Sequence, residues 1–298
     1  MREIDAAAAG TWQLGDLTVN RIGLGTKRLA GSRPTDNGPG NDKVRERAAA
    51  LLRRAVALGV NHIDTAAFYP SFANPSEGPT AFTSLGWANA LVREALAPYP
   101  EDLVIATKVG PTESGLARPD QLRALVEADL RDLGRDQLDL VYLRQGGLTS
   151  VAEHFGVLAD LRDEGLIRHL GLSNVRAEHL AEARSIAPVA AVQNRYAVDF
   201  GRGNDELLRA CGEAGIAFVG FFTLAAEARE TGGVASNETV EAIAGEHGAT
   251  AAQVRIAWQL SQGAHVLAIP GTSDPDHLDD NIASGALRLS EDELARLG

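Results

Sequence analysis

Short apolar runs alternate with helix-type segments along almost the whole chain, and this recurrence restricts the possible folds more than any other feature. Each run reads as a buried strand, and each is followed by a longer stretch with helical periodicity. The expected strands are 20–26, 60–65, 103–108, 138–143, 167–172, 189–194, 216–221 and 266–270. The expected helices are 42–58, 84–97, 119–133, 150–164, 176–186, 204–214, 237–247, 250–262 and 275–284, with a short one from residue 290.

About eight strand–helix pairs predict a parallel sheet that is covered by helices. In 298 residues, eight such units fit an α/β fold of the (β/α)8 TIM barrel type better than a doubly wound sheet. An alternating segment over 12–19 with a Gly15-Asp16 turn predicts an N-terminal β-hairpin. We therefore expect one barrel domain over residues 1–298. A Rossmann domain is not expected, because Gly23-Leu24-Gly25 lacks the third glycine of that fingerprint.

Charge and composition exclude several classes of partner. The net charge is −12, with 28 basic and 40 acidic residues and no basic run, so nucleic acid and anionic membrane surfaces are poor partners. No apolar stretch is long enough to span a bilayer, and the acidic N-terminal residues do not resemble an export signal. The one cysteine, Cys211, lies in a helical pattern as a core residue and is typical of a reducing cytoplasm.

Polar residues follow the ends of the expected strands, where parallel α/β folds place their active sites. These ends carry Gly25-Thr26, Asp64, Lys108, Arg144, Ser173-Asn174, Gln193-Asn194, Phe221 and the 270–273 segment. His62 and Asp64 share one face of a strand, which leaves a metal-dependent hydrolase as one alternative. The other strand ends lack the necessary ligands, so no metal site is expected and His62 is interpreted as a satisfied core histidine.

Four motifs at these strand ends resemble the aldo-keto reductase superfamily. They are 59–65 (GVNHIDT), 105–108 (IATK), 170–174 (LGLSN) and 269–273 (IPGTS). Their order and spacing make the match specific, and it extends from the hairpin at Trp12 to the end of the chain. Within the superfamily the chain is most similar to the bacterial pyridoxal reductase-like branch, through 89–96 (NALVREAL), 165–175 (GLIRHLGLSNV) and 192–194 (VQN).

The resemblance implies a catalytic set of Asp64, Tyr69, Lys108 and a fourth residue. A phenol has an ordinary pKa of about 10 and is a poor acid at neutral pH. We expect the Lys108 ammonium, held by Asp64, to lower the pKa of Tyr69 toward a useful range. The family usually has a histidine at the fourth position, whereas this chain has Arg144. Arginine keeps its proton, so it orients a carbonyl and favours a substrate with an anionic oxygen beside that carbonyl.

The resemblance also implies a binding site for NADPH, with NADH as the alternative. Ser173, Asn174 and Gln193 match positions that hold the nicotinamide carboxamide, and Phe221 matches the aromatic residue that stacks on its ring. The rest of the implied cofactor set is Gly25, Thr26, Asp64, Leu224, Gly271, Thr272, Ser273, His277, Asp280 and Asn281. Residues 271–273 are expected to bind phosphate at the start of a helix, and Asp280 and Asn281 to contact adenine. His277 stands where many relatives have an arginine for the 2′-phosphate.

Two loops depart from the branch. The 70–87 segment is longer than the branch requires and holds Phe72, Phe82 and Trp87, which fits either a substrate lid or a packed Ω-loop. Residues 222–229 replace the usual Ser-Pro-Leu-Gly-Gly type of loop, which puts the pyrophosphate contacts there in doubt.

The predicted activity is NADPH-dependent reduction of a small-molecule carbonyl substrate, with pyridoxal as the leading candidate. The alternative is an NADP(H)-binding regulatory or redox-sensing protein with little turnover. The sequence leaves the oligomeric state open, and a monomer is compatible with it.

Overall fold

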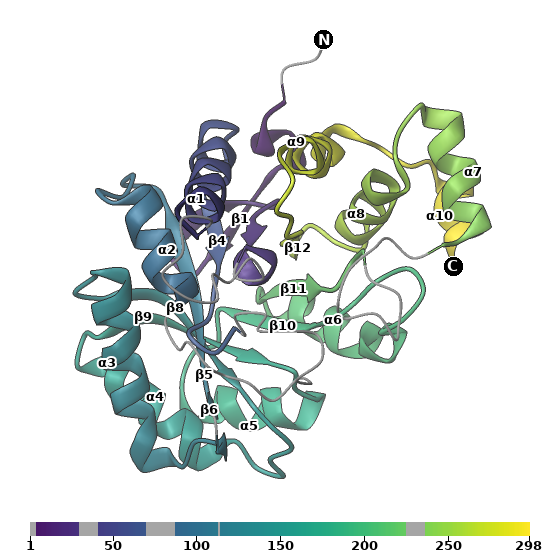
Figure 1. Ribbon diagram of the computed structural model, residues 1–298. Helices are drawn as coiled ribbons and strands as arrows, with labels where there is room; N and C mark the ends of the chain where they lie inside the picture. The colour runs from purple at the N-terminus through teal and green to yellow at the C-terminus, as the bar shows by residue number, and fades with distance from the viewer. Residues whose placement is uncertain (1–3, 30–40, 70–86, 113, 225–235) are drawn as a thin grey trace.

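The computed structural model describes residues 4–29, 41–69, 87–112, 114–224 and 236–298 (Figure 1). Eight parallel strands form its main sheet, in the order β12-β11-β10-β9-β8-β5-β4-β3. They are β3 (Leu24–Gly25), β4 (His62–Asp64), β5 (Val104–Val109), β8 (Leu138–Arg144), β9 (Ile167–Ser173), β10 (Ala191–Arg195), β11 (Ala217–Phe221) and β12 (Val266–Ala268). A parallel bridge between Ile22 and Ala268 joins the two ends of the sheet. The predicted (β/α)8 TIM barrel is therefore confirmed.

Helices surround this barrel on the outside (Figure 1). They are α1 (Asn41–Ala57), α2 (Trp87–Leu96), α3 (Leu122–Leu133), α4 (Ala152–Asp163), α5 (Ala177–Ile186), α6 (Asp205–Glu213), α7 (Glu238–His247), α8 (Ala251–Ser261), α9 (Pro275–Ala283) and α10 (Glu291–Leu297). Local signals explain several boundaries. The side chain of Thr250 caps α8 in a capping box with Gln253, and Gly134 ends α3 with a left-handed φ of 64°.

Strand side chains alternate between the barrel interior and the layer under the helices. Val104 and Ala106 of β5 pack in the interior cluster, whereas Ile105 and Val109 pack in the larger outer cluster. This alternation follows from the two-residue period of a strand, and it means that Lys108 shares the inward parity of Ala106. Thr107 shares the outward parity of Ile105.

The predicted N-terminal hairpin closes one end of the barrel. Its strands β1 (Thr11–Leu14) and β2 (Leu17–Asn20) pair antiparallel around Gly15, which has a φ of 64°. Leu14 and Val19 are fully buried in the interior cluster, so the hairpin seals the end at which the strands begin. The carboxyl ends of the strands form the other end, where the predicted site residues lie.

A second, shorter hairpin was not predicted. Its strands β6 (Pro111–Thr112) and β7 (Gly115–Leu116) pair antiparallel directly after β5. The helical turn that begins at Pro119 therefore leads into α3 at Leu122, later than the sequence predicts. In the part of the chain that is described, no helix has the length and apolar character to cross a bilayer.

Candidate active site

Two charged side chains meet inside the barrel near the ends of β4 and β5. Asp64 and Lys108 are almost wholly buried, at 1% and 4% exposed. The Lys108 Nζ atom donates to Asp64 Oδ1 at 2.7 Å and to the backbone oxygen of Thr65 at 2.9 Å. The pair is therefore a buried ion pair with a further hydrogen bond on the ammonium, which is the arrangement in which buried charges are tolerated.

The Tyr69 hydroxyl completes a three-residue cluster. It lies 2.7 Å from Lys108 Nζ, which donates to it, and it donates to Asp64 Oδ1 at 3.0 Å. Gln193 Nε2 donates to the second oxygen, Asp64 Oδ2, at 2.6 Å. Both oxygens of the carboxylate are thus held, and the three predicted catalytic residues from β4, its following loop and β5 are in direct contact.

The pKa values of this cluster differ from the sequence-based expectation. Burial raises the pKa of Tyr69 well above its ordinary value, with a further rise from Asp64 and an opposing effect of Arg144. Burial also lowers the pKa of Lys108, which Asp64 opposes. The expected lowering of the Tyr69 pKa is wrong, because burial and the Asp64 charge outweigh the opposing charge of Arg144. The phenol consequently holds its proton at neutral pH, which is the state that a proton donor needs.

Arg144 lies at the end of β8 beside two other predicted residues. Its Nη1 atom is 3.2 Å from the Ser173 hydroxyl at the end of β9, and its guanidinium lies 5.3 Å from the centre of the Phe221 ring at the end of β11. Because its charge acts on the pKa of Tyr69, Arg144 is electrostatically part of the same site. A fixed cation, a buried hydroxyl and an aromatic ring therefore lie together next to the Tyr69 cluster.

The strand ends around this cluster are packed closely. A Cβ atom on Gly25 would lie 2.8 Å from the Ile269 oxygen, and one on Gly271 would lie 2.6 Å from the Gly25 oxygen. Asn174 has a φ of 61°, a left-handed conformation that asparagine tolerates, and its N–H donates to the Gln193 oxygen at 2.9 Å. The structure thus brings Gly25 to Gly271 and Asn174 to Gln193, as expected for parts of one site.

Other predicted cofactor residues have mixed positions. Thr26 is fully buried and donates to the Thr65 hydroxyl at 3.0 Å, so its side chain faces the layer behind the strands rather than the open end. Leu224 is partly buried against the outer core, and Asn281 is 3% exposed within α9. Asp280 is half-buried, and its backbone oxygen accepts from Gln253 at 3.2 Å.

The start of α9 is already capped by its own chain. Asp274 accepts from the N–H groups of Asp276 and His277 at 2.8 and 3.3 Å, and the Asp274 N–H donates to the Thr272 hydroxyl at 3.0 Å. A phosphate would compete with the Asp274 carboxylate for these two helix amides. Of the groups expected to bind phosphate, the 271–273 segment therefore remains available, whereas the first amides of α9 are already hydrogen-bonded to Asp274.

Sequence reasoning missed Gln145, which braces the loop after β8. Its Oε1 atom accepts from the N–H groups of Gly147 and Leu148 at 2.7 and 3.0 Å, and its amide donates to the Asn174 oxygen. The side chain is 6% exposed, and it ties this loop to the end of β9. The sequence signal that could have identified Gln145 is its position as a polar residue directly after β8.

His62 is buried in the strand that carries Asp64, but it is not a satisfied core histidine. Neither ring nitrogen has a hydrogen-bond partner among the described residues, and burial lowers its pKa to about 4. Within the same part of the chain, no three His, Cys, Asp or Glu side chains are arranged to hold a metal ion.

Phe72, Phe82 and the 225–229 segment lie outside the described residues, while Trp87 begins α2.

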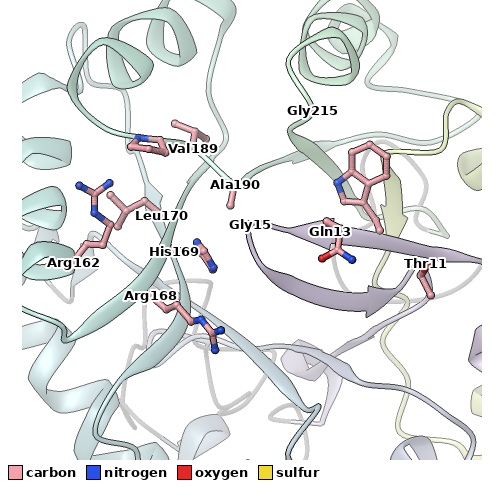
Figure 2. A pocket seen from close by; sticks show the side chains of 12 residues that line it. Thr11, Gln13, Gly15, Arg162, Arg168, His169, Leu170, Val189, Ala190 and Gly215 are labelled. Carbon is pink, nitrogen blue, oxygen red and sulfur yellow. The ribbon is translucent and has the colours of Figure 1, made fainter.

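A separate cavity of about 570 Å³ lies at the other end of the barrel (Figure 2). It is lined by the N-terminal hairpin, the start of β9 and the segment before β10, and the side chains of Arg162, Arg168 and His169 contribute to it. Arg168 and His169 both pair with Asp16, each at 2.6 Å. None of the Tyr69 cluster lines this cavity, so it is distinct from the site.

Comparison with known proteins decides the family. The model of the aldo/keto reductase family matches residues 21–298. The chain belongs to the aldo/keto reductase family. A pyridoxine 4-dehydrogenase of Escherichia coli is 39% identical over 308 residues, which cover 97% of this chain and 98% of the relative. An uncharacterised oxidoreductase of Schizosaccharomyces pombe is 35% identical over 302 residues, covering 99% and 90%.

Solved aldo/keto reductases share the fold. A thermostable member superposes with a TM-score of 0.78 at 30% identity and covers 96% of this chain and 98% of its own. A Klebsiella pneumoniae aldo-keto reductase in complex with NADPH gives a TM-score of 0.74 at 26% identity, covering 94% and 90%. The predicted family and branch are confirmed, and the chain is an oxidoreductase that acts on carbonyl compounds. These comparisons do not support the regulatory or redox-sensing alternative.

Proposed function

We propose that this aldo/keto reductase uses NADPH to reduce a small aldehyde to its alcohol, and that pyridoxal, reduced to pyridoxine, is its substrate. The observation that carries the proposal is the contact of the Tyr69 hydroxyl with both Lys108 and Asp64 at the open end of the barrel. A protonated phenol held by an ammonium is suited to donate a proton to a carbonyl oxygen. We place this activity in the cytoplasm, on a single barrel domain over residues 1–298.

The residues at the open end suit a nicotinamide dinucleotide. Ser173, Asn174 and Gln193 offer the hydroxyl and amide groups that match a carboxamide, and the half-buried ring of Phe221 offers a stacking surface. Solved relatives are described as complexes with NADPH and with NADP. When bound, NADPH supplies the hydride for the carbonyl carbon and leaves as NADP⁺.

The side chains of this chain handle the proton. As negative charge develops on the carbonyl oxygen, the Tyr69 hydroxyl turns its proton from Asp64 toward that oxygen and protonates it to the alcohol. Lys108 stabilises the phenolate that remains, and Asp64 keeps Lys108 in place. Because an alkoxide is a stronger base than a phenolate, Tyr69 is acidic enough for this step even with a raised pKa.

Arg144 supports the choice of pyridoxal within the aldehydes. Pyridoxal has an ionisable ring hydroxyl next to its aldehyde, and a guanidinium beside the site would hold that oxygen together with the carbonyl. The identity of 39% to a pyridoxine 4-dehydrogenase supports the same substrate.

The test is NADPH oxidation by the purified protein with pyridoxal, beside a Tyr69→Phe variant. We expect turnover by the wild type and a loss of kcat of roughly 10²-fold or more in the variant, because general acid catalysis contributes about that much. NADPH binding, followed by quenching of protein fluorescence, should be unchanged in the variant. NADH replaces NADPH in a parallel series to measure the cofactor preference.

Two outcomes would contradict the proposal. A wild type that reduces other aldehydes but not pyridoxal would reject the substrate. A Tyr69→Phe variant with the wild-type rate would reject the role of Tyr69.

A further inference from the structure

A network of hydrogen-bonded polar side chains lies directly behind the catalytic ion pair. The Thr65 hydroxyl donates to Asn89 Oδ1 at 2.9 Å, and Asn89 Nδ2 donates to Asp129 Oδ1 at 2.8 Å. The Thr107 hydroxyl donates to the other carboxylate oxygen, Asp129 Oδ2, at 2.7 Å. This series of hydrogen bonds extends to Thr26, whose hydroxyl donates to the Thr65 hydroxyl at 3.0 Å. Both oxygens of one buried carboxylate thus accept hydrogen bonds, one from helix α2 and one from strand β5.

The polar side chains of this network are more deeply buried than polar side chains usually are. Thr65, Asn89 and Thr107 are fully buried, and Asp129 is 1% exposed. A buried carboxylate costs free energy even when it is hydrogen-bonded, and an apolar replacement of the whole set would often be at least as stable. Stability alone therefore gives a weak reason for a carboxylate at this place.

The positions of the two threonines connect the network to the site. Thr65 directly follows Asp64, and its backbone oxygen is one of the acceptors of Lys108. Thr107 directly precedes Lys108 in β5. Because successive side chains of a strand point to opposite faces, Thr107 points outward to Asp129 while Lys108 points inward to Asp64. Asp129 therefore connects the end of β4, through Asn89 and Thr65, with the end of β5, through Thr107. These are the two strand ends that carry Asp64 and Lys108 on their inner sides.

The two helices that supply the network are packed against each other, and α3 also packs against β5. Asn89 lies in α2 and Asp129 in α3, and the two helices are neighbours in the outer layer (Figure 1). We propose that Asp129 is a positioning residue for the reaction. Through Asn89 and Thr107 it fixes the ends of β4 and β5 so that Asp64 and Lys108 stay within hydrogen-bonding distance of the Tyr69 hydroxyl. This inference rests on the proposed function.

Asp129 also acts on Lys108 through its charge. It is among the groups that raise the pKa of Lys108, together with Asp64, against burial and Arg144, which lower it. Burial, with a smaller contribution from the charge of Asp132, raises the pKa of Asp129 to about 7, against the hydrogen bonds of Thr107 and Asn89 and the charge of Lys108, which lower it. Around neutral pH the residue is thus partly ionised, and its negative charge favours the ammonium form of Lys108.

The test uses two variants of Thr107, one without and one with the hydroxyl, and one charge variant of Asp129. Thr107→Val removes the hydroxyl and keeps the shape, Thr107→Ser keeps the hydroxyl, and Asp129→Asn removes the charge. Asp139→Asn is the matched control, since the half-buried Asp139 is also a carboxylate bound to β5, through the Ile105 N–H at 2.9 Å, but it pairs with Arg135 rather than with the Tyr69 cluster. For each protein we would measure kcat, KM for both substrates and the pH profile of kcat, after unfolding curves have shown a folded state.

Thr107→Val and Asp129→Asn should lower kcat roughly ten-fold with little change in KM, because small misplacements of catalytic groups reduce the rate more than binding. Thr107→Ser and Asp139→Asn should keep kcat within about two-fold of the wild type. In Asp129→Asn the alkaline limb of the pH profile should move to lower pH, because loss of a nearby negative charge favours deprotonation of both Lys108 and Tyr69.

The controls separate the possible failures. A wild type without turnover on any aldehyde would remove the proposed function and this inference with it. An active wild type beside folded Asp129→Asn and Thr107→Val proteins with unchanged kcat and pH profile would overturn this inference alone. An equal loss of kcat in Asp139→Asn would also overturn it, because the effect would then be general to carboxylates that are bound to β5.

Discussion

The guanidinium of Arg144 lies beside Ser173 and Phe221. We interpret it as the group that selects between aldehydes. Arg144→Gln should reduce kcat/KM for salicylaldehyde, at a pH where its hydroxyl is ionised, by about 10-fold to 100-fold, since a charge-assisted hydrogen bond contributes about 1.5–3 kcal/mol. Benzaldehyde, which lacks the hydroxyl, should lose much less. The two aldehydes therefore form a matched pair, and equal losses for both would show that Arg144 does not select an anionic oxygen.

The residues of the site differ in how far the sequence could predict them. Asp64 and Lys108 stand in motifs at strand ends, and Tyr69 follows Asp64 by five residues, so the contact between the three could be predicted. The raised pKa of Tyr69 could not, because it depends on how completely the hydroxyl is enclosed. The orientation of Thr26 was missed for a similar reason, since its hydroxyl finds a partner on another strand.

At the scale of elements, β3 and β12 meet where the barrel closes. Hydrogen bonds cross this seam from the Gly23 N–H to the Ala268 oxygen and from the Ala268 N–H to the Arg21 oxygen, both at 2.9 Å. Just beyond it, a Cβ atom on Gly271 would lie 2.6 Å from the backbone oxygen of Gly25, which a rigid strand end cannot move easily.

Gly271→Ala should therefore lower the free energy of unfolding by about 1–3 kcal/mol, as overpacking does, and weaken NADPH binding because the 271–273 segment must shift. Urea unfolding and fluorescence titration with NADPH measure the two effects. Gly245→Ala in α7 is the control, because open space surrounds its Cβ position, and a small gain in stability is expected there. If both alanine variants bind NADPH alike, the seam does not shape the cofactor site.

The order and approximate ends of the strands and helices followed from the sequence, since hydrophobic periodicity and capping residues are local signals. The Asp129 network did not, although each member stands out as a polar residue within an apolar pattern. Asn89 and Asp129 lie on different helices, and only the packing of α2 on α3 shows that they face each other. Contacts between helices depend on rotations that the sequence pattern does not specify.

At the scale of the whole molecule, two buried groups give stability opposite dependences on pH. Asp129 has a folded pKa of about 7, above its ordinary value of 3.8, so between these pH values the folded state binds a proton that the unfolded state has lost. Its contribution to the free energy of unfolding therefore falls as pH rises from about 4 to about 7. His62 has a folded pKa of about 4, below 6.5, so the unfolded state binds the extra proton and the contribution of His62 rises with pH over that interval.

These two contributions should largely cancel in the wild type between about pH 4 and pH 6.5. Asp129→Asn removes one of them, so the stability of this variant relative to the wild type should increase with pH, by up to about 1.4 kcal/mol per pH unit, and level off above about pH 7. Urea unfolding of both proteins at a series of pH values measures this difference. Because the other titrating groups are common to both proteins, the difference reports on Asp129 and on its effect on the pKa of Lys108. A difference that stays constant from pH 4 to pH 8 would mean that Asp129 titrates alike in the folded and unfolded states, and that its burial does not hold its proton.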